Sequence, residues 1–124
     1  MKYIILTLFL FSTSLNAEPI FHEKRYPNGN KLFPAVILLH TSGGYNKSVY
    51  YNGHGDYFIK NSFAIYVPDF FSRHNIKSKT RGRTWGKYLK DIEAELSEIV
   101  AIMKRDPKID RNNIFAVGLS LIHI

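Results

Sequence analysis

The chain has 124 residues, of which 17 are Lys or Arg and 10 are Asp or Glu, so its formal net charge is +7 at pH 7. The absence of cysteine excludes disulfide bonds, thiol chemistry and thiolate metal sites. The five histidines do not fall at any local zinc-ligand spacing, so we expect no metal site, and no cofactor is expected either: they are His22, His40, His54, His74 and His123.

The first 17 residues, MKYIILTLFLFSTSLNA, have the layout of a secretory signal peptide, with Lys2, a short apolar stretch and small or polar residues ending at Ala17. A membrane anchor is the alternative, but the apolar stretch is much shorter than the roughly 20 residues that span a bilayer. We therefore expect cleavage after Ala17, a periplasmic or extracellular location, and no membrane span in the mature chain. The remaining length suits one small domain or a piece of a larger one.

Three continuous apolar runs predict strands that are covered on both faces, as in a parallel sheet. They are PAVILLH (34–40), FAIYVPD (63–69) and NIFAVG (113–118). Upstream of them, the turn-rich segment around Pro27–Asn30 predicts a hairpin or loop tip that joins short strands at a sheet edge. The segment 47–61 is ambiguous, because Asn52–Gly55 is expected to interrupt a helix.

One long amphipathic helix is predicted from Thr84 to Arg105, ending before Asp106-Pro107. Its apolar stripe consists of Trp85, Leu89, Ile92, Leu96, Ile99, Val100 and Met103. Its other faces are expected to carry Lys87, Lys90, Asp91, Glu93, Glu95 and Glu98.

Strands that alternate with helical segments predict an α/β fold built from two βαβ units. Right-handed crossovers make the three apolar strands parallel, so their carboxyl ends share the edge where ligands bind in such sheets. The loops His40–Gly44, Asp69–Arg73 and Gly118–Leu121 fall at that edge.

Those loops contain groups suited to acyl transfer. Ser120 follows the third strand as Gly118-Leu119-Ser120, where a sharp strand-to-helix turn exposes a nucleophile. The backbone N–H of Leu121 and one from the loop after the first apolar strand are expected to form the oxyanion hole. Gly-x-Ser alone is a common sequence, and Gly43-Gly44 taken alone fits an ordinary turn equally well.

The segments PAVILLHTSGG, FAIYVPDFFSRHN and KIDRNNIFAVG resemble the amino-terminal half of a dienelactone hydrolase-like protein of the α/β-hydrolase superfamily. The resemblance covers roughly residues 31 to 118. It implies a partial α/β-hydrolase fold truncated at the nucleophile elbow. It also implies an oxyanion-hole donor at the backbone of Thr41 or Ser42, with Ser42 favoured, a substrate carboxylate held by Arg73, and a serine or cysteine nucleophile at Ser120.

The chain departs from the family pattern at several positions. Thr41 stands where the true dienelactone hydrolases have glutamate, and Ile122 stands where the elbow has its closing glycine. The family's acid and histidine lie downstream of the elbow, and neither His123 nor Asp69 is assigned to those roles. LSLIHI also matches a translation of transposon-end DNA used in sequencing libraries. We therefore expect residues 119–124 to be a non-native tail and residues 18–118 to be the informative part of the domain. We also expect this polypeptide to be inactive.

The sequence thus predicts an exported hydrolase fragment whose parent cleaves a carboxylic ester or lactone of a small molecule through an acyl-enzyme. The alternative is a secreted non-catalytic protein that binds anionic polymers through the basic segment 73–90. Nucleic acid is not expected as a partner, because aromatic residues do not interleave with these charges. The sequence makes no prediction of oligomeric state.

Overall fold

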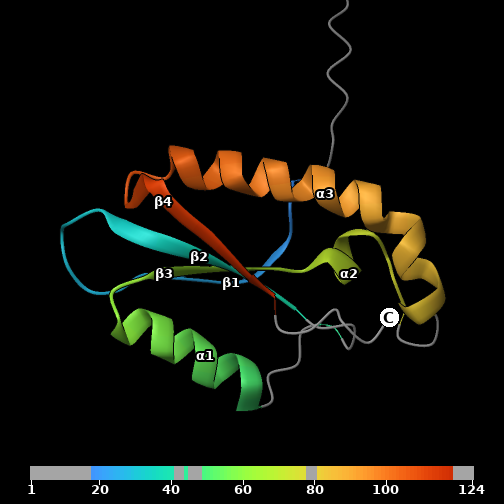
Figure 1. The fold of residues 1–124 in the computed structure, drawn as a ribbon, viewed down its shortest axis with the longest axis horizontal. Helices are drawn as coiled ribbons and strands as arrows, with labels where there is room; N and C mark the ends of the chain where they lie inside the picture. Colours follow the sequence, from blue (N-terminus) through green and yellow to red (C-terminus); the bar gives the residue numbers. More distant parts are fainter. Residues whose placement is uncertain (1–17, 41–43, 45–48, 78–80, 119–124) are drawn as a thin grey trace, which may run out of the picture.

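A four-stranded sheet forms the centre of the fold (Figure 1). The computed structural model describes residues 18–40, 44, 49–77 and 81–118. The strand order is β1-β3-β2-β4, with bounds β1 Phe21–Arg25, β2 Phe33–Leu39, β3 Ala64–Pro68 and β4 Ile109–Gly118. The α/β class expected from the sequence is confirmed.

Three of the strands are parallel and one is not. Strand β2 pairs in parallel with both β3 and β4, as predicted for the three apolar runs. Strand β1 is a short edge strand that runs antiparallel to β3, with Phe21 opposite Pro68, so the sheet is mixed rather than purely parallel. Its residues alternate between half-buried and exposed, which suits an antiparallel edge strand with one solvated face.

The turn around Pro27–Asn30 connects strands that are not neighbours. It leads from β1 to β2, but β3 lies between these two strands, so the segment is a loop rather than the tip of a hairpin. Gly29 has φ 129°, a backbone conformation that side chains disfavour and that glycine adopts freely.

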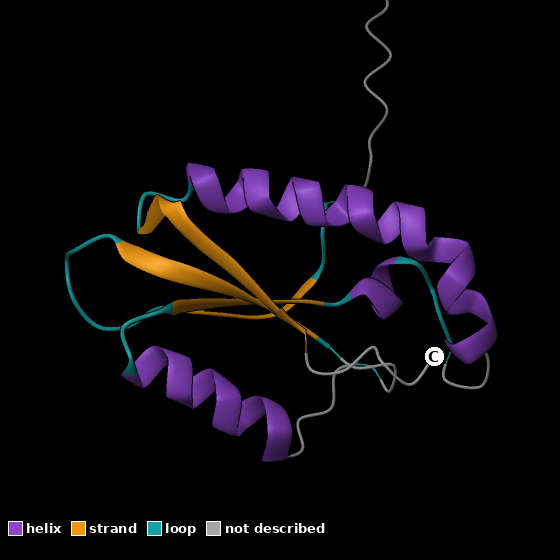
Figure 2. Ribbon diagram, viewed as in Figure 1, coloured by secondary structure: helices purple, strands orange, loops and turns teal. Residues whose placement is uncertain are grey.

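Helices cover both faces of the sheet (Figure 2). Helix α3 (Arg81–Arg105) lies on one face and helix α1 (Val49–Lys60) on the other. Alternate residues of each central strand point to opposite faces: Ala35 and Ile37 pack in the α3 core, whereas Val36 and Leu38 pack with residues of α1. This two-sided burial explains why the apolar runs of β2 and β3 are continuous. The prediction was wrong for NIFAVG (113–118) in β4, whose residues are half-buried or exposed because β4 lies at the edge of the sheet.

Helix α1 runs through the Asn52–Gly55 segment that was expected to interrupt it. At Gly55, an added Cβ would lie 2.3 Å from the guanidinium Nη2 of Arg25 and 3.1 Å from Cδ1 of Ile65, so a side chain here would have to displace the Arg25 head group and crowd Ile65. Gly53 has nothing within 4 Å of such a Cβ. Tertiary packing at Gly55 thus outweighs the low helix propensity of glycine.

Helix α3 begins three residues before the predicted start and ends where predicted. The apolar stripe packs on the sheet through Ile92, Leu96, Ile99, Val100 and Met103. Two assignments on this helix are wrong: Leu89 is 46% exposed, and Glu95, expected on a solvent face, is only 2% exposed. Glu95 is buried because its carboxylate contacts Arg73 and His74, as described below.

A cluster of hydrogen-bonded side chains connects the C-terminal end of α3 to the sheet. The hydroxyls of Tyr26 and Tyr66 each donate a hydrogen bond to the same oxygen of Asp106, at 2.6 Å. Burial alone would raise the pKa of Asp106, but the hydrogen bonds from Tyr26, Tyr66 and the backbone N–H of Lys108 outweigh burial and lower it. Burial, followed by the contact with Asp106, raises the pKa of Tyr66.

Strand β4 forms an open edge of the sheet. It pairs only with β2 among the described strands, and Phe115 is 50% exposed. An apolar strand with unpaired backbone groups is a site where another strand can add. Within the described ranges, no helix is both long enough and apolar enough to cross a membrane.

Candidate functional site

The carboxyl ends of the parallel strands share one edge of the sheet, as predicted. In the β2–β4 register, Leu39 lies opposite Gly118, and both strands end there. Strand β3 ends at Pro68 and is followed at once by Asp69. Because β1 is antiparallel, its first residues lie at this same edge, beside the end of β3.

Four of the predicted catalytic positions lie outside the described residues. They are Thr41 and Ser42, proposed as oxyanion-hole donors, Ser120, proposed as the nucleophile, and Leu121, proposed as the second donor. Gly44, in the same loop as Ser42, is described: it is buried and has φ 82°, a conformation that favours glycine.

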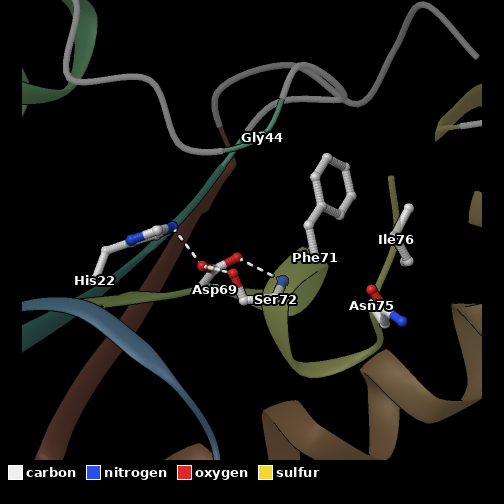
Figure 3. Close-up of a pocket in the computed structure, with 7 residues that line it drawn as sticks. All are labelled: His22, Gly44, Asp69, Phe71, Ser72, Asn75 and Ile76. Atoms are coloured by element: carbon white, nitrogen blue, oxygen red, sulfur yellow. Dashed lines mark hydrogen bonds and ion pairs between the residues drawn. The ribbon is translucent and has the colours of Figure 1, made fainter. Parts of the chain in front are cut away.

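A pocket of about 440 Å³ opens at this edge (Figure 3). Its polar lining comes from His22 on β1, Asp69 after β3, Ser72 on helix α2 (Phe70–Arg73) and Asn75. Phe71, Ile76 and Gly44 complete the lining. A concave site with a few convergent polar groups is the usual form of a small-molecule site.

Asp69 is the central polar group of the pocket. Its side chain is 6% exposed, and one oxygen lies 2.8 Å from Nε2 of His22. The same oxygen accepts a hydrogen bond from the Ser72 hydroxyl, and the other accepts one from the Ser72 backbone N–H at 2.9 Å. Asp69 thus caps helix α2, which explains the fixed position of a carboxylate expected from sequence to be an ordinary turn residue.

These three side chains are not arranged as a catalytic triad. In a triad the histidine lies between the acid and the serine, so that it can take the hydroxyl proton. Here Asp69 lies between His22 and Ser72 and contacts both (Figure 3). The arrangement holds the pocket wall in place rather than activating Ser72 as a nucleophile.

Arg73, predicted to hold a substrate carboxylate, contacts two carboxylates of helix α3. Its Nη1 lies 2.9 Å from Glu98 and 3.4 Å from Glu95, and its side chain is 13% exposed. Burial lowers the pKa of the Arg73 guanidinium, but the contacts with Glu98 and Glu95 outweigh burial and raise it. Arg73 is not among the described residues that line the pocket.

The partner of Arg73 on α3, Glu95, is itself buried, with a side chain 1% exposed. It also lies 2.9 Å from Nε2 of His74, whose ring is tilted against Tyr88 at 5.4 Å. Burial raises the pKa of Glu95, although the contacts with His74 and Arg73 oppose that rise. These contacts join the segment that follows α2 to the long helix, and so fix one side of the pocket.

His40, the first residue after β2, is 1% exposed. Its ring packs against Phe71 at 4.5 Å and Phe70 at 5.5 Å. His40 therefore connects the end of β2 with helix α2.

Three lining residues were not identified from the sequence: the polar His22 and Asn75, and the apolar Ile76. His22 reaches the site only because β1 runs antiparallel beside β3, a pairing that no local pattern predicts. Asn75 has φ 52°, a left-handed conformation that asparagine tolerates better than most residues. Its position two residues after the PDFFSR segment was the only sequence signal available.

The described ranges contain no group of three His, Asp or Glu side chains placed to hold a metal ion. No protein-family model, curated protein or solved structure matches the chain.

Proposed function

We propose that residues 18–118 are the amino-terminal part of an exported hydrolase of the dienelactone hydrolase-like type. The parent enzyme cleaves a carboxylic ester or lactone through an acyl-enzyme. The residue at position 120 attacks the carbonyl carbon, and backbone N–H groups of Ser42 and Leu121 hold the oxyanion.

One observation carries this proposal: the parallel strands β3, β2 and β4 end at one edge, and the pocket opens there. Leu39 and Gly118 are paired neighbours, so the segments that contain Ser42 and Ser120 start side by side. At about 3.5 Å per residue, Ser120 is within about 7 Å of Gly118 along the chain. A nucleophile and an oxyanion-hole donor need this proximity.

The uncovered apolar strand β4 supports the view that more polypeptide belongs to the same domain. In the proposed mechanism a histidine takes the proton from the nucleophile and returns it to the leaving alcohol, and an acid orients that histidine. The described residues offer no such pair beside the position of Gly118. The resemblance to the dienelactone hydrolase-like family implies that both groups lie downstream of the elbow in the parent enzyme.

The experiment is an ester-hydrolysis assay on purified residues 18–124, using p-nitrophenyl acetate, with Ser120→Ala as the matched control. We expect no turnover above that of the Ser120→Ala variant. Turnover that Ser120→Ala abolishes would show that the chain carries its own proton-transfer group and that this assignment is wrong. Salt-sensitive binding of a polyanion without turnover would instead support the alternative role of the basic segment 73–90.

A further inference from the structure

The side chains that line the pocket beside Asp69 indicate which part of the substrate it binds. We propose that it binds a neutral group with several hydroxyls, of the sugar or sugar-alcohol type, so that the ester cleaved is a carbohydrate ester. This inference rests on the proposed function, because it treats the pocket as part of the hydrolase's substrate site.

The polar groups of the pocket suit hydroxyls. Ser72 gives its hydroxyl hydrogen to Asp69, so its oxygen presents lone pairs as acceptors. Asn75 is exposed at the rim and carries both an acceptor oxygen and a donor NH₂. A ligand hydroxyl both donates and accepts, so it can satisfy each of these groups.

The charge of the pocket disfavours an anionic ligand. Asp69 contributes a carboxylate whose partners are Ser72 and His22, and none of the described lining residues is Lys or Arg. Arg73, the cationic residue that follows Ser72 in the sequence, contacts Glu98 and Glu95 and does not line the pocket. A substrate carboxylate in this pocket would lie beside the Asp69 carboxylate with no Lys or Arg among the described lining residues to offset it, and like charges in contact are unfavourable.

The rest of the lining suits the carbon side of a sugar ring. Phe71 and Ile76 form apolar walls beside the polar groups (Figure 3). A volume of about 440 Å³ lies within the usual range for small-molecule sites and has room for one sugar ring. Polar groups on one side with an aromatic ring on another match the two kinds of surface that a sugar ring presents.

The test is a ligand-observed NMR titration of the 124-residue chain with two probes that share one ring. Methyl β-D-glucopyranoside is neutral, and methyl β-D-glucuronide carries a carboxylate. The titration is repeated on Ser72→Ala and on Asn75→Gly, the latter chosen because glycine keeps the left-handed backbone at φ 52°. Ser97→Ala is the matched control, since the Ser97 hydroxyl bonds only to a carbonyl on the exposed face of α3.

We expect the neutral glucoside to bind at least about tenfold more tightly than the glucuronide. Ser72→Ala and Asn75→Gly should each weaken glucoside binding by about fivefold, the effect of one hydrogen bond, whereas Ser97→Ala should leave it unchanged. Amide NMR spectra of each variant identify any variant that fails to fold. If one pocket variant fails to fold, the glucoside affinity of the other pocket variant tests the inference.

Any of three results would overturn the inference: tighter binding of the glucuronide than of the glucoside, equal glucoside affinity in both pocket variants and the control, or no glucoside binding. Binding is measured without turnover, so a chain that binds the glucoside but belongs to no hydrolase would refute the proposed function while leaving the pocket assignment standing. Absence of glucoside binding, together with a source locus that continues from Gly118 as Gly-x-Ser-x-Gly or Gly-x-Cys-x-Gly, would refute the sugar inference alone.

Discussion

Replacing Tyr66 by phenylalanine removes one hydroxyl from the centre of the polar cluster at Asp106. Tyr66 is fully buried, and its hydroxyl donates to the Asp106 carboxylate at 2.6 Å. A hydrogen bond to a charged group contributes about 1.5–3 kcal/mol, so we expect Tyr66→Phe to lower the free energy of unfolding by about 2 kcal/mol. With a typical urea dependence for a small domain, the midpoint of urea unfolding falls by about 1 M.

This loss should depend on pH in a defined direction. The hydrogen bonds lower the folded-state pKa of Asp106 from its usual value, so their contribution is fully present above the unfolded-state pKa. That contribution declines as the pH falls below about 4 and through the folded-state pKa. The difference between the native chain and Tyr66→Phe should therefore be largest at neutral pH and shrink in acid.

The assay is urea unfolding followed by circular dichroism at pH 7 and pH 3. Tyr57→Phe is the matched control, because Tyr57 is 64% exposed, and we expect its effect to stay within about 0.5 kcal/mol. If the two variants are equally stable, or if the Tyr66→Phe deficit is the same at both pH values, the description of the cluster is wrong.

Three further predictions use the same unfolding assay or a measurement of association. Glu95→Ala should lower the free energy of unfolding by about 3 kcal/mol, since it removes the buried carboxylate that contacts a histidine and an arginine. Glu93→Ala should change that free energy little, because Glu93 is exposed. Equal effects would contradict the burial of Glu95. Gly53→Ala should stabilise the chain by about 0.5–1 kcal/mol through helix propensity, and Gly55→Ala should destabilise it because its Cβ meets the sheet; a stabilising Gly55→Ala would refute the close helix–sheet approach. Phe115→Lys should reduce concentration-dependent association in analytical ultracentrifugation, because a charge on an open edge strand opposes strand pairing; unchanged association would show that β4 is not an accessible edge.

The apolar runs of β2 and β3 and the long helix were predictable because their patterns reflect burial directly, whereas the run NIFAVG in β4 is half-buried or exposed. Val36 and Ile37 point to opposite faces that are both covered, so a continuous run was the correct sign of a central strand. The end of α3 was predictable from Asp106-Pro107, since proline disfavours helix geometry in the residue before it. These are local signals, and the structure follows them.

The rest depended on contacts between distant segments. Glu95 belongs to a polar helical face by its residue type, and its contacts with His74 and Arg73 explain its burial. The helix continues through Gly55, where it closely approaches Arg25 and Ile65, which lie elsewhere in the sequence. Likewise, His22 lies beside Asp69 because β1 pairs antiparallel with β3, and the sequence alone did not predict this pairing.

We propose that this chain belongs to a hydrolase that uses the residue at position 120 as its nucleophile. The most direct measurement is to sequence the source locus across codon 118, with primers placed outside the last six codons of the chain. We predict that the frame continues as Gly-x-Ser-x-Gly or Gly-x-Cys-x-Gly from Gly118, with an aspartate and a histidine downstream. A native frame that reads LSLIHI and then stops would contradict the catalytic account.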